Sequence, residues 1–332
     1  MSLRIGFIGT GAIANLHARA HRSIGNVIVA CTSLVEEEGR RFAAEFGGAF
    51  YPGYEDVCRH RDVDVIDVCT FPDFRLQPLQ LASEHGKHVQ VEKPIAIDTK
   101  TARAMIDTAR RAGVVLGVVS QHRFDDASQF LAAAIPAGRL GKLIQCDAYV
   151  KWHRSDAYYS RPIKGSWATE GGGALINQAI HQVDLLRWLV GPVRDVAAMW
   201  QIGATHKIES EDVVSALLRY ENGATGVIQA STSIVPGYPE RLELHGSKGT
   251  AIISGDRLVA WDVANDAGDP APVATNVASG ASDPMAISLT PFERQFRDYA
   301  DAIRHKREPR ISGESGYEAL EIVERIYNAC RG

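Results

Sequence analysis

The sequence lacks the marks of several protein classes. No apolar run reaches the roughly 18 residues needed to cross a bilayer, and the first residues lead straight into an apolar strand with no leader or cleavage pattern. The formal net charge is only −4 at pH 7, which gives no general attraction to nucleic acid or to an anionic membrane. These absences favour chemistry on a small molecule in the cytoplasm.

The cysteines are too scattered to form a disulfide framework or a metal centre. They include no CxxC pair and no spacing typical of metal ligands. Three of them fall in apolar strand-like or helical segments, where a reduced, buried thiol is the ordinary expectation. We therefore expect no metal cofactor. The five residues are Cys31, Cys58, Cys69, Cys146 and Cys330.

The first third of the chain alternates short apolar runs with amphipathic stretches. Such apolar strands, separated by helices, predict a parallel sheet covered on both faces. Right-handed crossovers then make it a doubly wound fold. The expected strands are 4–8, 27–31, 63–69, 88–91 and 114–119, and the expected helices end near 22, 46, 85 and 112.

The pattern changes after about residue 120. A long strand is expected at 143–152, and an apolar helix at 171–190. Asn222-Gly223, between two β-rich runs, predicts a hairpin, and a second hairpin is expected at 242–253. We thus predict two domains, 1–121 and 122–332. The second is an α+β domain with a large, mostly antiparallel sheet, whose C-terminal helices can pack back on the first domain.

A glycine-rich turn joins the first strand to the first helix. In Gly9-x-Gly11-x-x-Ala14, the first glycine permits the tight turn, the second lets the backbone approach a pyrophosphate, and Ala14 lets helix and strand pack closely. The helix N-terminus, with Ala12 and Ile13, offers N–H groups to the phosphates. In this position the motif predicts a Rossmann site for a nicotinamide dinucleotide.

The end of the second strand should contact the ribose of that cofactor. An acidic residue there would bind the 2′-hydroxyl of NAD, but the sequence has Thr32 and Ser33 instead. The following run of three glutamates, 36–38, favours NAD, unless it is simply a solvated helix start. NADP and NAD both stay open, with a slight preference for NADP.

Two further clusters carry groups suited to proton transfer. Glu92-Lys93-Pro94 ends a parallel strand, where ligands bind in open α/β sheets, although a solvated loop lysine would look the same. Further on, Asn177 and His181 are four residues apart and share a helix face. A core histidine with satisfied hydrogen bonds is the alternative for His181 alone.

Together these motifs resemble those of the Gfo/Idh/MocA oxidoreductase family over nearly the whole chain. The resemblance implies that Lys93 and His181 lie beside the substrate hydroxyl and the nicotinamide, and that Glu92 shapes the loop. It also implies that Thr70 and Pro72 lie near the cofactor, although Arg75 stands where many relatives have histidine. The C-terminal sheet often serves as an oligomer interface in this family, so a homodimer or homotetramer is expected.

One departure from the family pattern concerns the helix with His181. Many members have aspartate four residues before the histidine, whereas this chain has Asn177. An amide can orient an imidazole without raising its proton affinity. We therefore expect Lys93 to carry most of the acid–base work, His181 to assist, and Asp184 to brace the helix.

The candidates for substrate binding surround these motifs. Aromatic rings beside hydrogen-bonding and basic groups suit a sugar, polyol or sugar acid, although a solvated basic loop explains them equally well. The sequence thus predicts an NAD(P)-dependent dehydrogenase or reductase. The alternatives are a lyase or glycosidase that recycles its NAD, and a non-catalytic nucleotide-binding regulator. The candidates are Arg123, Trp152, His153, Tyr158 and Trp167.

Overall fold

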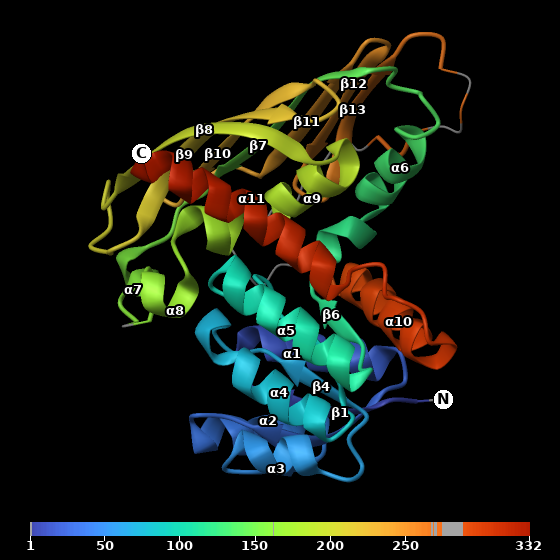
Figure 1. Ribbon diagram of the computed structural model, residues 1–332, viewed down its shortest axis with the longest axis vertical. Coiled ribbons are helices and arrows are strands. Elements are labelled where there is room, and N and C mark those ends of the chain that lie inside the picture. The colour runs from blue at the N-terminus through green and yellow to red at the C-terminus, as the bar shows by residue number, and fades with distance from the viewer. Residues whose placement is uncertain (1, 162, 267, 269–270, 274–287) are drawn as a thin grey trace. The chain divides into compact units, whose positions relative to one another are not determined.

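The chain divides into two compact units in the computed structural model, which describes residues 2–161, 163–266, 268, 271–273 and 288–332 (Figure 1). One unit comprises Met1–Gln121 and Ser288–Tyr317, and the other comprises His122–Ile287 and Glu318–Gly332. Within the described ranges, no helix has both the length and the apolar character needed to span a membrane.

The first unit is built on a six-stranded parallel sheet with the strand order β3-β2-β1-β4-β5-β6. This order confirms the predicted doubly wound fold. The strands are β1 (Arg4–Ile8), β2 (Val27–Thr32), β3 (Ala49–Phe50), β4 (Val65–Val68), β5 (His88–Val91) and β6 (Leu116–Val118).

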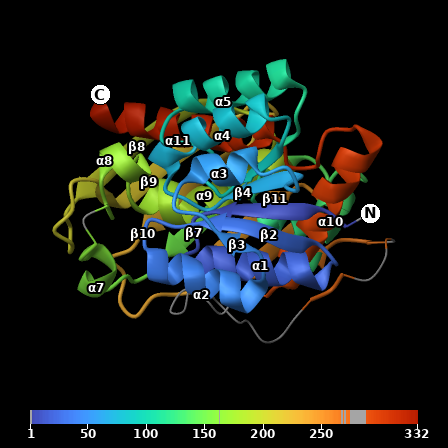
Figure 2. The ribbon, with the colours of Figure 1, turned by 90° about the horizontal axis from the view of Figure 1, so that it is seen from below.

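Helices cover both faces of this sheet. Figure 2 shows α1 and α2 on one face and α3, α4 and α5 on the other. The helices of this unit are α1 (Ala12–Ser23), α2 (Glu36–Phe46), α3 (Tyr54–Arg59), the short η1 (Pro72–Phe74), α4 (Leu76–Glu84), α5 (Thr99–Ala112), α10 (Thr290–His305) and the first residues of α11 (Gly313–Arg331).

The strand order reverses between β1 and β4, which are neighbours at the centre of the sheet. Both strands are buried because helices cover each face, which explains their nearly continuous apolar sequences. The carboxyl ends of β1, β2, β4 and β5 lead into the segments predicted to contact the cofactor. In open α/β sheets, the crevice at such a reversal is where ligands bind.

The second unit contains a seven-stranded sheet with the order β13-β12-β11-β7-β10-β9-β8. All neighbours are antiparallel except β7 and β10, which confirms the predicted mostly antiparallel sheet. The strands are β7 (Leu143–Lys151), β8 (Val193–Ile202), β9 (Glu211–Tyr220), β10 (Thr225–Ser231), β11 (Arg241–Gly246), β12 (Gly249–Ser254) and β13 (Arg257–Val263).

One face of this sheet forms the core of the unit. Along β9, Val214, Ala216 and Leu218 are buried, whereas the alternate residues Ser215 and Leu217 are exposed. This alternation is the expected pattern for an antiparallel sheet with one covered face. The helical segments are η2 (Gln121–Phe124), α6 (Asp126–Ala134), α7 (Asp156–Tyr159), α8 (Trp167–Glu170), η3 (Leu175–Ala179), α9 (Ile180–Val190) and the remainder of α11.

Candidate functional site

The glycine-rich turn after β1 has a conformation that its sequence requires. Gly9 has a φ of +92°, and a Cβ at this position would lie 3.0 Å from the carbonyl oxygen of Cys69. Only glycine tolerates both conditions. A Cβ at Gly11 would meet no atom within 4 Å, so the backbone there is open to a ligand.

The start of α1 is suited to an anion. No side chain of the described residues caps this helix, and its first turn contains no acidic residue, so its N–H groups and positive dipole end face a ligand without competition. Within the described part of the chain, the buried hydroxyl of Thr10 also has no hydrogen-bond partner. These features fit the pyrophosphate of a dinucleotide.

The end of β2 presents small polar side chains. The carbonyl of Thr32 accepts the N–H of Gly9 at 3.0 Å, which ties β2 to the glycine-rich turn. The hydroxyl of Ser33 accepts the N–H of Val35 at 3.3 Å. The nearest glutamate on α2, Glu36, pairs with Arg40 on the exposed side of the helix. Ser33 thus directly follows β2, where the sequence predicts a contact with the ribose.

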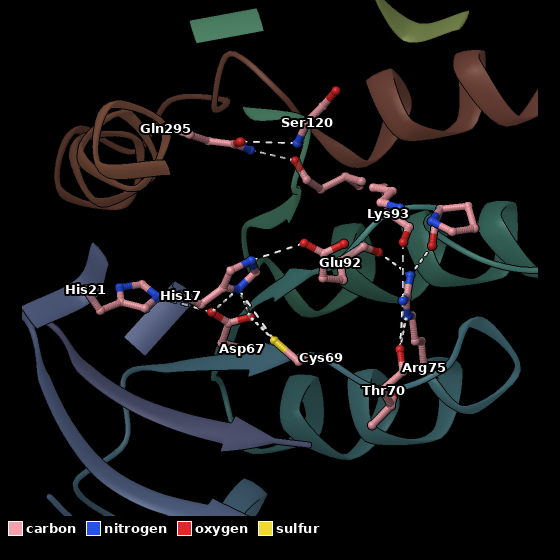
Figure 3. A network of polar contacts seen from close by, with 12 residues as sticks. His17, His21, Asp67, Cys69, Thr70, Arg75, Glu92, Lys93, Ser120 and Gln295 are labelled. Carbon is pink, nitrogen blue, oxygen red and sulfur yellow. Dashed lines mark hydrogen bonds and ion pairs between the residues drawn. The ribbon is translucent and has the colours of Figure 1, made fainter. Parts of the chain in front are cut away.

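Arg75 joins the loops that follow β4 and β5. Its guanidinium donates to the carbonyl of Thr70 from Nη2 at 2.7 Å and from Nε at 3.1 Å. It also donates to the carbonyls of Glu92 and Pro94, with that of Lys93 at 3.5 Å (Figure 3). Arg75 is only 3% exposed, and burial lowers its pKa to about 10.

A buried histidine holds the side chain of Glu92, in the loop that follows β5. His17, on α1, donates from Nε2 to Glu92 at 3.1 Å and from Nδ1 to Asp67 at 3.0 Å. Burial opposes protonation of His17, but the charge and hydrogen bond of Asp67 outweigh it, so the pKa of His17 lies well above its usual value. His21 donates to Asp67 at 3.2 Å. A metal ion needs ligand atoms close together, and one such atom from each of His17, Asp67 and Cys69 lies within 4.8 Å of the others. Hydrogen bonds already connect these side chains.

In the second unit, His181 lies in the first turn of α9 and contacts another histidine. The rings of His181 and His122 meet edge to face, with centroids 4.9 Å apart. Nδ1 of His122 lies 2.7 Å from a carboxylate oxygen of Asp125. Burial lowers the pKa of His122, but Asp125 more than compensates and the net shift is upward. Asp125 therefore supplies a carboxylate to the histidine that contacts His181.

A buried carboxylate accepts hydrogen bonds from the backbone at the start of the helical segment that carries His181. Glu211 accepts the N–H groups of Gly173 at 2.7 Å and of Leu175 at 2.8 Å. A Cβ at Gly173 would lie 1.9 Å from the carbonyl oxygen of Glu211, so glycine is required there. Burial raises the pKa of Glu211 to about 7.

The first helical residues then form the π-helical turn η3 rather than the regular α-helix expected from the sequence. In this turn the amide of Asn177 donates to the carbonyl of Gly172 at 3.3 Å. Single π-helical turns in longer helices often occur at functional sites. This one immediately precedes His181.

Arg123 is held by Asp184. Its Nε and Nη2 donate to the two carboxylate oxygens at 2.8 and 2.6 Å, and its guanidinium lies over the ring of Trp188. The side chains are only 7% and 5% exposed. This bidentate pairing braces α9 against η2 and occupies the guanidinium of Arg123.

Aromatic and charged groups gather around Tyr158. Its hydroxyl accepts the amide of Gln178 at 3.1 Å, and Arg154 stacks on both Trp152 and Tyr158. Lys164 lies over the same tyrosine ring. Among the described residues, the buried Nε1 of Trp152 and Oε1 of Gln178 have no hydrogen-bond partner.

Two other predicted substrate residues lie in different surroundings. Trp167 donates from Nε1 to the carbonyl of Glu209 at 2.9 Å and packs against the rings of Trp200 and Tyr327. His153 is exposed and lines a cavity of about 290 Å³ together with His206 and other polar residues. Arg154, which lies over the ring of Tyr158, also lines this cavity.

Comparisons with known proteins match both units. Residues 3–120 match the model of an oxidoreductase family with an NAD-binding Rossmann fold, and residues 128–252 match that of the GFO/IDH/MocA C-terminal domain. The 1,5-anhydro-D-fructose reductase of Ensifer adhaerens is 29% identical over 96% of this chain and 93% of its own length. The myo-inositol 2-dehydrogenase of Thermotoga maritima gives the same three values.

A solved structure resembles the whole chain. The crystal structure of the WlbA dehydrogenase from Bordetella pertussis, in complex with NADH and UDP-GlcNAcA, superposes with a TM-score of 0.87 and 28% sequence identity. The alignment covers 100% of this chain and 97% of that one. Both units of the chain thus have counterparts in a nicotinamide-binding enzyme.

Proposed function

Because the chain belongs to the Gfo/Idh/MocA family of NAD-binding oxidoreductases, we propose that it moves a hydride between a nicotinamide dinucleotide and a hydroxyl-bearing carbon of a neutral sugar or polyol. The observation that carries this proposal is the placement of Lys93. Its loop leaves the same edge of the parallel sheet as the dinucleotide turn, and Arg75 and His17 fix it there.

Residues of the protein transfer the hydroxyl proton. When a carbinol is oxidised, its carbon gives up a hydride, and a bound nicotinamide would accept that hydride. The hydroxyl proton passes to Nζ of Lys93, and a carbonyl remains. Reduction runs the same steps backwards. His181 assists by polarising the reacting oxygen, and His122 and Asp125 hold its ring. General acid–base catalysis of this kind contributes about 10²- to 10⁴-fold in rate.

The substrate class follows from the groups around Tyr158. Trp152 offers an unused donor and Gln178 an unused acceptor, which suits hydroxyl groups because each hydroxyl both donates and accepts. Lys164 is already paired with Glu170, so its charge is balanced. Together these features favour an uncharged polyhydroxylated substrate over a sugar acid.

The experiment pairs each neutral compound with its acid. We expect purified protein to reduce or oxidise nicotinamide with at least one neutral sugar or polyol. The value of kcat/KM for the matching uronic acid should be lower by a factor of about ten or more. Absorbance of the reduced nicotinamide gives both rates. A uronic acid that reacts faster than every neutral partner would overturn the assigned substrate class.

The same edge of the sheet favours NADP over NAD. The side chain that follows β2 is Ser33 rather than a carboxylate, and a carboxylate there would bind the 2′-hydroxyl of NAD and repel a 2′-phosphate. We expect the Kd for NADPH to be lower than that for NADH, and Ser33→Asp to reverse the order by weakening NADPH binding about tenfold or more. Fluorescence titration measures both constants. Ser33→Thr, which keeps a hydroxyl, is the control, and an unchanged ratio in Ser33→Asp would contradict the assignment.

A further inference from the structure

One buried guanidinium serves four backbone carbonyls from two loops. Arg75 donates to the carbonyls of Thr70, Glu92 and Pro94, and that of Lys93 lies 3.5 Å from Nη2. Thr70 follows β4 and the other three follow β5. The carbonyls that flank Lys93 in sequence are thus attached to a single rigid group (Figure 3).

The Glu92 side chain, in the loop that follows β5, is held by a different residue. Glu92 accepts a hydrogen bond from His17, which also donates to Asp67. Asp67, His17, Glu92 and Arg75 form a buried row with alternating charges. His17 lies on α1, one turn after the dinucleotide-binding start of that helix. The row therefore connects the cofactor-binding helix to the loop that carries Lys93.

We propose that Arg75 and His17 are positioning residues that hold Lys93 in place for proton transfer. This inference rests on the proposed acid–base role of Lys93. Arg75 fixes the loop backbone and His17 fixes the Glu92 side chain, and both act on Lys93 through these contacts. A catalytic group misplaced by about 1 Å can lose about 10²-fold in rate, which gives such a device a measurable consequence.

Arginine is the side chain that this geometry requires. Its planar group presents five N–H donors in a fixed fork, whereas lysine has three on a flexible stem and histidine has at most two. A lysine at position 75 keeps the charge but cannot reach the carbonyls of both loops together. Arg75 can therefore tie the two loops through a single side chain.

Arg75→Lys provides the first test. We expect kcat to fall about 10- to 100-fold, while KM and the Kd for the dinucleotide stay within about threefold. The control is Arg4→Lys, because Arg4 is a hydrogen-bonded arginine of the same unit, paired with Asp64, but lies at the amino end of β1; it is expected to retain full turnover. Dinucleotide binding confirms that the first unit is folded. Full kcat in Arg75→Lys contradicts the proposal.

A double-mutant cycle separates this proposal from the proposed function. If Arg75 acts through Lys93, Arg75→Lys should lower kcat by no more than about threefold in a Lys93→Ala background. Losses that multiply would contradict positioning through Lys93. Normal turnover in Lys93→Ala alone would instead refute the acid–base role of Lys93 itself, whatever Arg75 does.

His17→Gln tests the other anchor. Glutamine can still donate to Glu92 but cannot carry the positive charge between two carboxylates. We expect the same pattern as for Arg75→Lys, with a lower kcat, a nearly unchanged dinucleotide Kd and no further loss in the Lys93→Ala background. A variant that binds dinucleotide normally and keeps full kcat would remove His17 from the proposal.

Discussion

Replacing Lys93 by alanine is expected to lower kcat by about 10²- to 10⁴-fold, because the substrate proton loses its acceptor. The Kd for the dinucleotide should stay within about threefold, since the pyrophosphate turn and α1 are untouched. Steady-state rates and fluorescence titration measure the two quantities. Lys100→Ala is the matched control, because Lys100 is exposed at the start of α5.

Comparing His181→Ala with Lys93→Ala shows which of the two residues transfers the proton. We expect a smaller loss of kcat than in Lys93→Ala, because His181 orients and polarises while Lys93 exchanges the proton. If Lys93→Ala keeps near-normal turnover and His181→Ala loses it, the roles are reversed. In that case the His122–Asp125 pair would be the support of the catalytic base rather than of an assisting group.

Replacing Arg123 by methionine is expected to destabilise the second unit by about 3–5 kcal/mol. The reason is that Asp184 would be left as a buried charge without its partner, at 5% side-chain exposure. All five tryptophans of the sequence (152, 167, 188, 200 and 261) lie in this unit. Tryptophan fluorescence during urea unfolding therefore reports on this unit alone.

Two further variants identify the cause of that loss. Arg123→Met/Asp184→Leu should be more stable than either single variant, because removing both charges removes the desolvation penalty as well. Arg187→Met is the matched control, because Arg187 lies on α9, the helix that carries Asp184. It breaks the more exposed pair with Glu318 and should cost about 1 kcal/mol or less. Equal losses from Arg123→Met and Arg187→Met would show that burial of the pair does not matter.

The sequence predicts the parts of the fold that repeat locally. Apolar runs separated by amphipathic helices identified the parallel strands, and Asn222-Gly223 marked the β9–β10 hairpin. It did not predict β3, α3 or β8. β3 is two residues long, too short for any periodicity. β8 exposes most of its residues, so its sequence shows little apolar alternation.

The contacts that hold the loop of Lys93 were beyond the reach of the sequence. His17 reads as an ordinary helix residue because its partners, Asp67 and Glu92, are 50 and 75 residues away. The position of Arg75 in the sequence indicates only a departure from a family pattern. The sequence predicts a substrate group at Arg123 and gives no sign of its pairing with Asp184, which is 61 positions later. Long-range pairing of charges has no local signature, and only the folded chain shows it.

The most direct test of the account follows a labelled hydrogen. A neutral polyol that supports turnover is prepared with deuterium on its carbinol carbon, and the dinucleotide is analysed by mass spectrometry. We predict one deuterium in the reduced, released dinucleotide for each carbonyl product formed, and slow transfer in Lys93→Ala. Product formed without net reduction of the dinucleotide would indicate a cofactor recycled in place. Bound dinucleotide that accepts no deuterium from any sugar or polyol would contradict the proposed enzyme.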